Sequence, residues 1–435
     1  MSGGAALMLA GVLLFPVLLS GMPIAFSVAL VSVIYFMLAG TDHASIGSTM
    51  FWFLNKSELV AIPFFILTAD LLGKSRATDA LVTAAEATVG HLRGGLALVA
   101  MITTVIFSAV CGSSVATAVA VGRVMIPKMI EAGYQRRFAV GMIAAAGGLG
   151  ILIPPSVPLI IYATIVEISV ADVFLAAFGP GLMLAAAMSA YVVWLGDRAR
   201  SPERRDRRVD LTRVPAAQAF RHAAPVLALP LLIMGGIYSG VFTPTESAAV
   251  SAIYAAVLAF TIYRKPKMEP LPRILAESGN VAASILLIMT ATSILSYIIT
   301  LNQIPLMFRQ LITGWELSPV VFLLCVNLLL LILGCFLEII SVILITVPIF
   351  LPVLIALDIN LVHFGIIVIV NMELGVITPP VGMNLFAISA ISRTPVQDVF
   401  RGTLPFMLIM LVMLLLFTNS EALSLLTLNH LPSLR

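Results

Sequence analysis

Several hydroxyl side chains lie inside otherwise apolar sequence, close to glycines and upstream of a pair of adjacent prolines. Gly112, Ser113, Ser114 and Thr117 form one such group, and the proline pair lies within residues 147–158. Two adjacent prolines remove two backbone donors and clash with the preceding turn, so a helix cannot continue through them. Hydroxyls and the carbonyls freed by such a break suit a hard cation such as sodium. The first predicted sodium site comprises Gly112, Ser113, Ser114, Gly148, Ile151 and Pro154.

A second interruption of the same kind lies in the second half of the chain, where Pro379 and Pro380 fall within the apolar segment 361–392. A hairpin tip around Glu338 and Ser341 is expected to face this break. The second predicted sodium site comprises Glu338, Gly375, Thr378, Gly382 and Asn384. No cofactor and no transition metal are expected, because the five histidines are scattered and the three cysteines have no metal-ligand spacing.

Glu338 is the one carboxylate predicted at mid-membrane depth on a hairpin. Three roles are open to it: binding a cation, relaying protons, or capping the following helix at its positive end. Glu373 precedes the second break by six residues. Glu246, in the run Thr243-Pro244-Thr245-Glu246, has the position of an early acidic residue in a new helix.

The two breaks belong to an internal repeat. Pro127 precedes Pro154 by 27 residues and Pro352 precedes Pro379 by 27, so both pairs are offset by 225. Ser20-Gly21 and the segment 31–35 also recur 219 residues later. A duplicated hydrophobic chain with corresponding interrupted helices is typical of a secondary transporter with inverted repeats.

Composition places the chain in a membrane. Of the 435 residues, 60% are hydrophobic and 10% charged, against roughly 25% charged in soluble domains. We therefore expect an all-α polytopic membrane protein. The net charge of +3 comes mostly from loops and indicates no nucleic-acid partner. Metalloprotease, α/β-hydrolase and P-loop motifs are absent from the sequence, so the chain is not expected to be an enzyme.

Hydropathy and turn residues predict the order of the elements. Helices are expected at about 5–20, 22–39, 58–73, 173–195, 223–240, 246–262, 278–299 and 402–419. Between the second and third, a polar connection is expected through Asp42 and His43. Residues 77–90 are read as an interfacial arm or a simple connecting helix. The first half is predicted to comprise scaffold helices at 1–57 and a first repeat at 58–196, which contains a hairpin at about 94–131 and a broken helix at about 136–167. A basic loop at 197–213 joins it to the second half. The second half is predicted to comprise scaffold helices at 214–277, a second repeat at 278–420 with a hairpin at about 319–357 and a broken helix at about 361–392, and a tail at 421–435.

Basic residues predict the topology. Arg93 before the first hairpin and Lys128 after it would both be cytoplasmic, which requires a re-entrant hairpin rather than a single crossing. The arginine-rich loop 197–213 is also expected in the cytoplasm. Five crossings per copy then invert the second repeat relative to the first. Both chain termini are predicted to be periplasmic.

With these motifs in place, the chain resembles the large membrane subunit of the tripartite ATP-independent periplasmic (TRAP) transporters, within the wider ion-transporter superfamily. The resemblance covers essentially the whole chain and is most specific at residues 62–65, 112–117, 150–158, 238–246 and 378–384. It implies sodium-coupled import of a small carboxylate, such as a C4-dicarboxylate, sialic acid or another organic acid, across the bacterial inner membrane by an elevator mechanism. It also implies two partners, a small four-helix membrane subunit and a periplasmic substrate-binding protein.

One position departs from the family pattern. Many relatives carry an aspartate near the first hairpin tip, where this chain has Thr117, so a role tied to that acid does not transfer. The small subunit is not fused here, which leaves Val12, Leu13 and Phe15 as candidate partner surface. The alternative functions are a self-sufficient ion/dicarboxylate symporter of the same superfamily and a channel.

A carboxylate substrate needs hydrogen-bond donors, which helix starts and amide side chains provide. It is therefore expected between the two hairpin tips. The predicted substrate-binding residues are Ser114, Thr117, Ser156, Ser341 and Asn384. Arg93, Lys128 and Arg136 should lie near the cytoplasmic interface, so no basic side chain is expected at this depth. Serine and threonine also bond to the preceding helical turn or glue helices together, and that structural role stays open for each hydroxyl.

Overall fold

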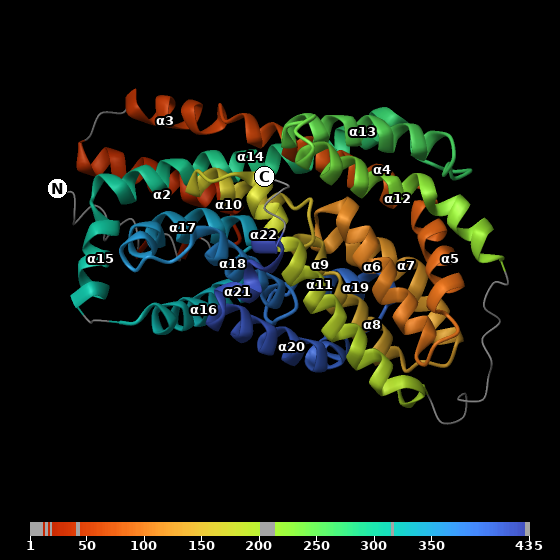
Figure 1. Cartoon of the computed structure of the whole chain (residues 1–435). Coiled ribbons are helices and arrows are strands. Elements are labelled where there is room, and N and C mark those ends of the chain that lie inside the picture. Colours follow the sequence, from red (N-terminus) through yellow and green to blue (C-terminus); the bar gives the residue numbers. More distant parts are fainter. Residues whose placement is uncertain are drawn as a thin grey trace.

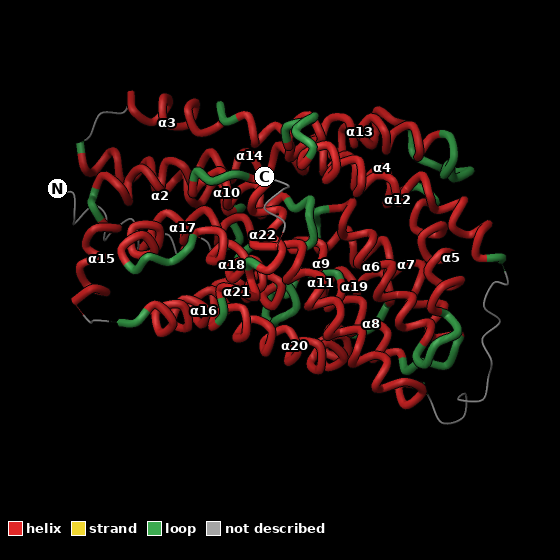
Figure 2. The backbone as a smooth tube through the Cα atoms, in the orientation of Figure 1, coloured by secondary structure: helices red, strands yellow, loops and turns green. Residues whose placement is uncertain are grey.

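A computed structural model of the chain describes residues 12–13, 16–17, 20–40, 44–200, 214–314 and 317–430. These residues form helices joined by loops (Figure 2), with one isolated bridge between Tyr134 and Arg200. Within these ranges, seven helices are long and apolar enough to cross a membrane, or eight spans if the bent pair Ile46–Leu54 and Ser57–Lys74 counts as one. The prediction of an all-helical multi-pass membrane protein is confirmed. Most of the predicted first helix and residues 201–213 lie outside the described part.

The first half begins with α2 (Ile24–Ala39), α3 (Ala44–Leu54), the 3-10 helix η1 (Ser57–Val60), α4 (Ala61–Lys74) and α5 (Ala77–Val89). Asp42 and His43, through which a polar connection was predicted, lie outside the described residues, and the segment after them, where no helix was predicted, forms α3 from Ala44. Ile46, Met50 and Phe53 recur at helical spacing and pack against buried residues, which gives α3 an apolar face despite its serines. The chain then bends by 64° into η1 and α4.

The first hairpin and broken helix follow as α6 (Gly95–Cys111), α7 (Ser114–Glu131), α8 (Arg136–Ala146), α9 (Leu149–Leu152), α10 (Val157–Val166), α11 (Val170–Leu195) and η2 (Gly196–Ala199). Two residues make the hairpin turn. Gly112 has a φ of 62°, in the left-handed region that favours glycine. Ser113 caps α7, its hydroxyl accepting the Ala116 N–H at 3.5 Å.

The second half contains α12 (Ala216–Tyr238), α13 (Pro244–Phe260), α14 (Leu271–Leu301), α15 (Ile304–Gly314), α16 (Pro319–Phe336), α17 (Ile339–Ala356), α18 (Leu361–Gly375), α19 (Met383–Ser392), α20 (Val396–Asn419), α21 (Glu421–Ser424) and α22 (Leu426–His430). The predicted helix start at Thr243–Glu246 is confirmed as a capping box. The Thr243 N–H donates to Glu246 Oε2 at 2.8 Å, and the Glu246 N–H donates to Thr243 Oγ1 at 3.2 Å.

The helices of the two halves interlock. In Figure 1, α2, α3, α4, α12, α13 and α14 run along one side of the molecule, where α4 packs on α13 and α14 packs on α2. Below them lie the hairpin and broken helices, with α7 against α19 and α8 against α20. The short helices α5 and α15 lie near opposite ends, across the long direction of the bundle. One large cluster of buried apolar residues runs through both halves.

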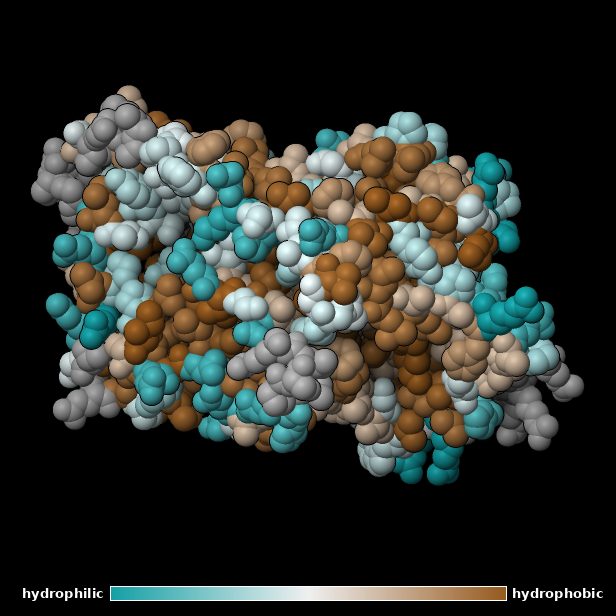
Figure 3. All heavy atoms as spheres, turned by 45° about the horizontal axis from the view of Figure 1, so that its top comes forward, coloured by the Kyte–Doolittle hydropathy of each residue, from teal (hydrophilic) through white to brown (hydrophobic). Residues whose placement is uncertain are grey.

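Hydrophobic side chains also cover broad areas of the surface (Figure 3). On α2, Phe26, Leu30, Val33 and Met37 recur at helical spacing and are 57%, 42%, 45% and 72% exposed. An apolar face of this kind is unfavourable in water but suits contact with lipid or with another membrane helix.

Candidate functional site

The tip of the first hairpin and the second helix break meet at one side chain. The Asn384 Nδ2 donates to Ser114 Oγ at 2.7 Å and to the Ala144 carbonyl at 3.0 Å. Asn384 begins α19, Ser114 begins α7 and Ala144 lies in the last turn of α8, so this amide joins three helices from both halves. Asn384 is fully buried and Ser114 nearly so. The contact brings together two residues that the sequence analysis placed at the substrate site.

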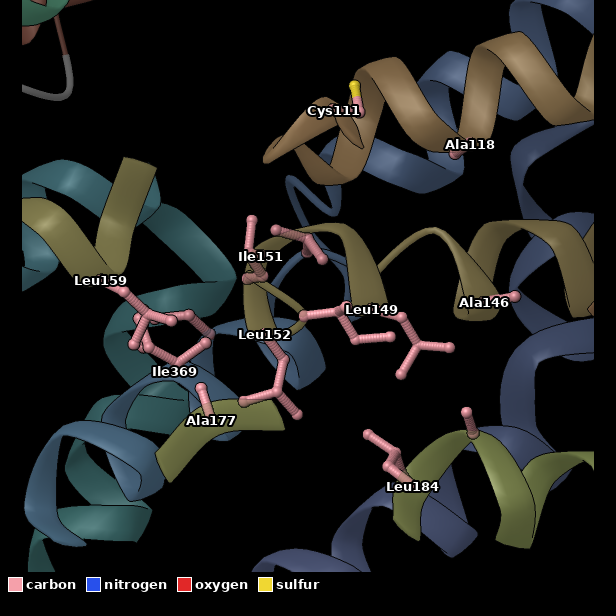
Figure 4. Packing of buried hydrophobic residues seen from close by; sticks show 14 of the residues in the cluster. Cys111, Ala118, Ala146, Leu149, Ile151, Leu152, Leu159, Ala177, Leu184 and Ile369 are labelled. Atoms are coloured by element: carbon pink, nitrogen blue, oxygen red, sulfur yellow. The ribbon is translucent and has the colours of Figure 1, made fainter. Parts of the chain in front are cut away.

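The first break divides this span into α8, α9 and α10, with Leu149, Ile151 and Leu152 packed into the core (Figure 4). Ser156 restarts the helix: its hydroxyl donates to the Ile151 carbonyl at 2.5 Å and accepts the Leu159 N–H at 3.4 Å. The Ile151 carbonyl, a predicted sodium ligand, therefore already accepts one hydrogen bond. Its oxygen has a second lone pair, which an ion could use.

The hairpin tip lies directly on this break. A Cβ built on Gly150 would approach Ser113 O to 2.6 Å and Thr117 Oγ1 to 2.8 Å. A Cβ on Gly112 would lie 2.7 Å from Pro155 O. Only glycine permits such backbone approach. The structure thus brings the tip residues of the first predicted sodium site against its break residues, although whether they bind sodium stays a prediction.

The second break is built in the same way. After α18 ends at Gly375, the Thr378 hydroxyl donates to the Leu374 carbonyl at 2.6 Å, and the Asn384 N–H donates to the Val376 carbonyl at 3.0 Å. The hairpin touches this break through the Val381 N–H, which donates to the Cys335 carbonyl at 3.1 Å. A Cβ on Gly375 would lie 3.0 Å from the backbone of Gly334.

Buried polar atoms without a hydrogen bond gather at these tips and breaks. In the part of the chain that the structure describes, they include Thr117 Oγ1, Ser341 Oγ, Asn384 Oδ1 and Glu338 Oε2. Native proteins rarely leave buried polar atoms unpaired, so such atoms point to a ligand, ion or water. The four atoms belong to residues that the sequence analysis assigned to substrate or sodium.

Glu338 occupies the N-cap position of α17. Its carboxyl lies near the backbone amides of Ile340 and Ser341, but its side chain makes no capping hydrogen bond. Among the described residues, no hydrogen bond joins Glu338 or Ser341 to Thr378 or Asn384. Cation binding, proton relay and helix capping all stay open as roles for Glu338.

The structure shows two features to which the sequence patterns assigned no role. Glu373 is fully buried, and neither of its carboxylate oxygens has a hydrogen-bond partner in the described ranges. An acidic residue in a long apolar run was the available signal. The second feature is a cavity of about 470 Å³ lined by α14 and α17 residues that include Ser293, Ser296 and Leu344, together with Lys56. Within the described residues no group of three His, Cys, Asp or Glu side chains could hold a metal ion.

Two interrupted apolar helices that meet two helical hairpins within an all-helical membrane protein are the arrangement of a secondary transporter. The chain matches the family described as "Tripartite ATP-independent periplasmic transporter, DctM component" over residues 11–423, and it belongs to this family. The resemblance seen in the sequence is confirmed. The chain is a membrane permease component and not an enzyme.

Two relatives and one solved structure illustrate the similarity. The chain is 41% identical to the C4-dicarboxylate TRAP transporter large permease protein DctM of Pseudomonas aeruginosa, over 84% of this chain and 85% of that protein. It is 34% identical to the sialic acid TRAP transporter large permease protein SiaM of Vibrio cholerae, over 92% of this chain and 93% of that protein. The YdaH transporter of Alcanivorax borkumensis is similar in fold, with a TM-score of 0.64, 15% identity, and coverage of 89% and 88%.

Proposed function

We propose that this chain is the large permease of a sodium-coupled TRAP transporter that imports a small carboxylate across the bacterial inner membrane. The observation that carries the proposal is the hydrogen bond from Asn384 to Ser114, because it joins the second helix break to the tip of the first hairpin. The relatives named for a C4-dicarboxylate and for sialic acid support an organic acid as the substrate.

Sodium is supported by the chemistry of the atoms at the breaks. The first break offers hydroxyl and carbonyl oxygens without a basic side chain, and hard monovalent cations prefer such ligands. Thr117 Oγ1, beside Gly150 of the first break, and Asn384 Oδ1, at the start of α19, are buried without a hydrogen bond in the described chain. Each sodium ion placed beside them would also attract the carboxylate of a substrate held between the tips.

The proposed mechanism is an elevator, in which the two hairpins and the two broken helices move together against the scaffold helices α2, α4, α12, α13 and α14. Contacts between α7 and α19 and between α8 and α19 support one moving body. The cavity of about 470 Å³ lies where α17 of this body faces α14 of the scaffold. Its lining includes none of the predicted substrate or sodium residues, so it lies at the boundary between the two bodies and not at the proposed substrate position between the tips.

The proposed topology places the basic loop 197–213 in the cytoplasm and both termini in the periplasm, so that the first hairpin opens to the cytoplasm and the second to the periplasm. The positions of α5 and α15 near opposite ends of the bundle support this inversion, since each precedes a hairpin in its own half. The family's tripartite description supports a small membrane subunit and a periplasmic binding protein as partners. Val12, which is 68% exposed, remains a candidate contact for the small subunit, whereas Phe15 lies outside the described residues.

Reconstitution tests the division of labour. Proteoliposomes containing this chain and its small subunit should take up a labelled carboxylate only when the loaded binding protein is added outside. Vesicles lacking the small subunit provide the control. Uptake of free substrate by this chain alone, at the rate seen with both partners, would contradict the proposal and favour a self-sufficient symporter.

A further inference from the structure

A carboxyl group is buried between the two helix breaks, and among the described residues no basic side chain pairs with it. Glu373 lies in the last turn of α18, and its exposed fraction is 0%. Both of its side-chain oxygens lack a hydrogen-bond partner in the described part of the chain. The ion pairs found in the same ranges join other residues, at Lys56, Lys74, Lys128 and Arg273.

The side chain of Glu373 packs against the other repeat. A Cβ built on Gly148, at the start of the first break, would lie 3.5 Å from Glu373 Cβ and 3.6 Å from its Cγ. The helix that carries Glu373 also packs against α9 within that break. Two residues further along its own chain, Gly375 ends α18 and begins the second break. One carboxyl therefore lies beside the backbone of both interruptions.

Electrostatics makes this placement informative. A buried ionised carboxylate is strongly unfavourable unless a cation or several donors compensate it. The side chains and carbonyls of the first break are neutral, so a sodium ion bound there would bring an uncompensated positive charge into the same buried region. The two costs cancel if the ion and the carboxylate lie together.

We propose that Glu373 extends the cation site at the first break, binding a sodium ion with its carboxylate together with the break's carbonyl oxygens. This inference rests on the proposed sodium coupling. It makes the site a shared one, with its charge supplied by the second repeat and its neutral oxygens by the first. An ion held there would also stabilise the end of α18, so filling the first site would favour filling the second.

Sodium-dependent thermal stabilisation tests the proposal on the purified complex of the full chain with its small subunit. Sodium chloride is titrated against choline chloride at constant ionic strength, with no substrate present. Wild-type protein should show a melting temperature that rises and saturates with sodium. In Glu373→Gln, which keeps the shape and removes the charge, the half-saturating sodium concentration should rise at least tenfold.

Glu86→Gln is the matched control. Glu86 is a buried carboxyl on α5, and its Oε1 pairs with Lys128 Nζ at 2.7 Å. Its sodium titration should follow that of the wild type. Glu373→Asp keeps the charge on a shorter side chain and should give a half-saturating concentration between those of wild type and Glu373→Gln, which also covers the case in which the glutamine variant does not fold.

Each contrary outcome is distinct. Equal sodium titrations for wild type, Glu373→Gln and Glu373→Asp would overturn the inference, because the group would then be a neutral structural acid, and would leave sodium coupling standing. If sodium does not stabilise the wild type relative to choline, both the inference and the proposed coupling ion are wrong.

Discussion

The amide of Asn384 donates a hydrogen bond of 2.7 Å to the hydroxyl of Ser114, 270 residues away in sequence. Each residue starts a helix next to a turn that proline or glycine makes possible. The bond therefore fixes the position of the first hairpin tip relative to the second broken helix. Because both residues are buried, a change in either should act on the site rather than on the surface.

Replacing Asn384 or Ser114 with leucine should reduce uptake to background. The Asn384→Leu variant also removes the donor to the Ala144 carbonyl, and unpaired buried groups cost about 1–3 kcal/mol each. The complex should still assemble and the binding protein should retain its ligand affinity. Asn419→Leu is the control, since the Asn419 amide is exposed and bonds only within its own helix. Near-normal uptake by both leucine variants would place the substrate elsewhere.

Gly150→Ala should separate the hairpin tip from the first break. The new Cβ would lie 2.6 Å from Ser113 O, and overpacking of this kind costs about 1–3 kcal/mol. The half-saturating sodium concentration for uptake should rise. The half-saturating concentration of loaded binding protein should change less. Gly235→Ala, whose Cβ meets nothing within 4 Å, serves as the control. Unchanged sodium dependence in Gly150→Ala would argue against a sodium site at this contact.

The breaks and hairpin turns could be predicted because their causes are local. Adjacent prolines stop a helix wherever they occur, and Gly112 with Ser113 forms a turn and a cap within four residues. The helix start at Thr243 was equally local. These features need no knowledge of what packs around them.

Other features depend on contacts between distant segments. The α3 helix has serines that obscure its apolar face, and α15 lies between the predicted helix 278–299 and the second hairpin, where no helix was predicted. The approach of Glu373 to Gly148 joins residues on different repeats. The cavity beside Lys56 forms only where α14 faces α17. Helical periodicity cannot reveal such juxtapositions, since it reports only one helix at a time.

A cysteine introduced at Ser201 should react only from the cytoplasm. The basic loop predicts this orientation under the positive-inside rule. In a background lacking Cys325 and Cys335, Ser201→Cys in intact cells should resist an impermeant maleimide until the membrane is opened. Ser239→Cys, at the exposed turn between α12 and α13, should react from outside. If Ser201→Cys reacts from outside and Ser239→Cys reacts only after the membrane is opened, the true topology is the inverse of the proposed one.

Linking Lys56 to Glu167 should stop transport. Lys56 Nζ donates to the Thr164 carbonyl at 2.9 Å and forms an ion pair with Glu167 at 3.3 Å, joining the α3–α4 bend to the end of the broken helix. An elevator has to break this contact during each cycle. A reducible thiol-reactive cross-linker applied to Lys56→Cys with Glu167→Cys should abolish uptake, and reduction should restore it.

The same cross-linker provides its own control within the scaffold. Lys74 on α4 pairs with Glu277 on α14, and both helices belong to the proposed stationary body. Linking cysteines at these two positions should leave uptake active. If the Lys56–Glu167 link also leaves uptake active, the broken helix does not move against the α3–α4 bend.

The most direct test of the central claim is the ion dependence of uptake by the complete system in proteoliposomes. With loaded binding protein outside, an inward sodium gradient should drive accumulation of the labelled carboxylate, and initial rates should rise more steeply with sodium than a single-site curve. Replacing sodium with potassium or choline should abolish accumulation. Full accumulation driven by a proton gradient in the absence of sodium would contradict the account.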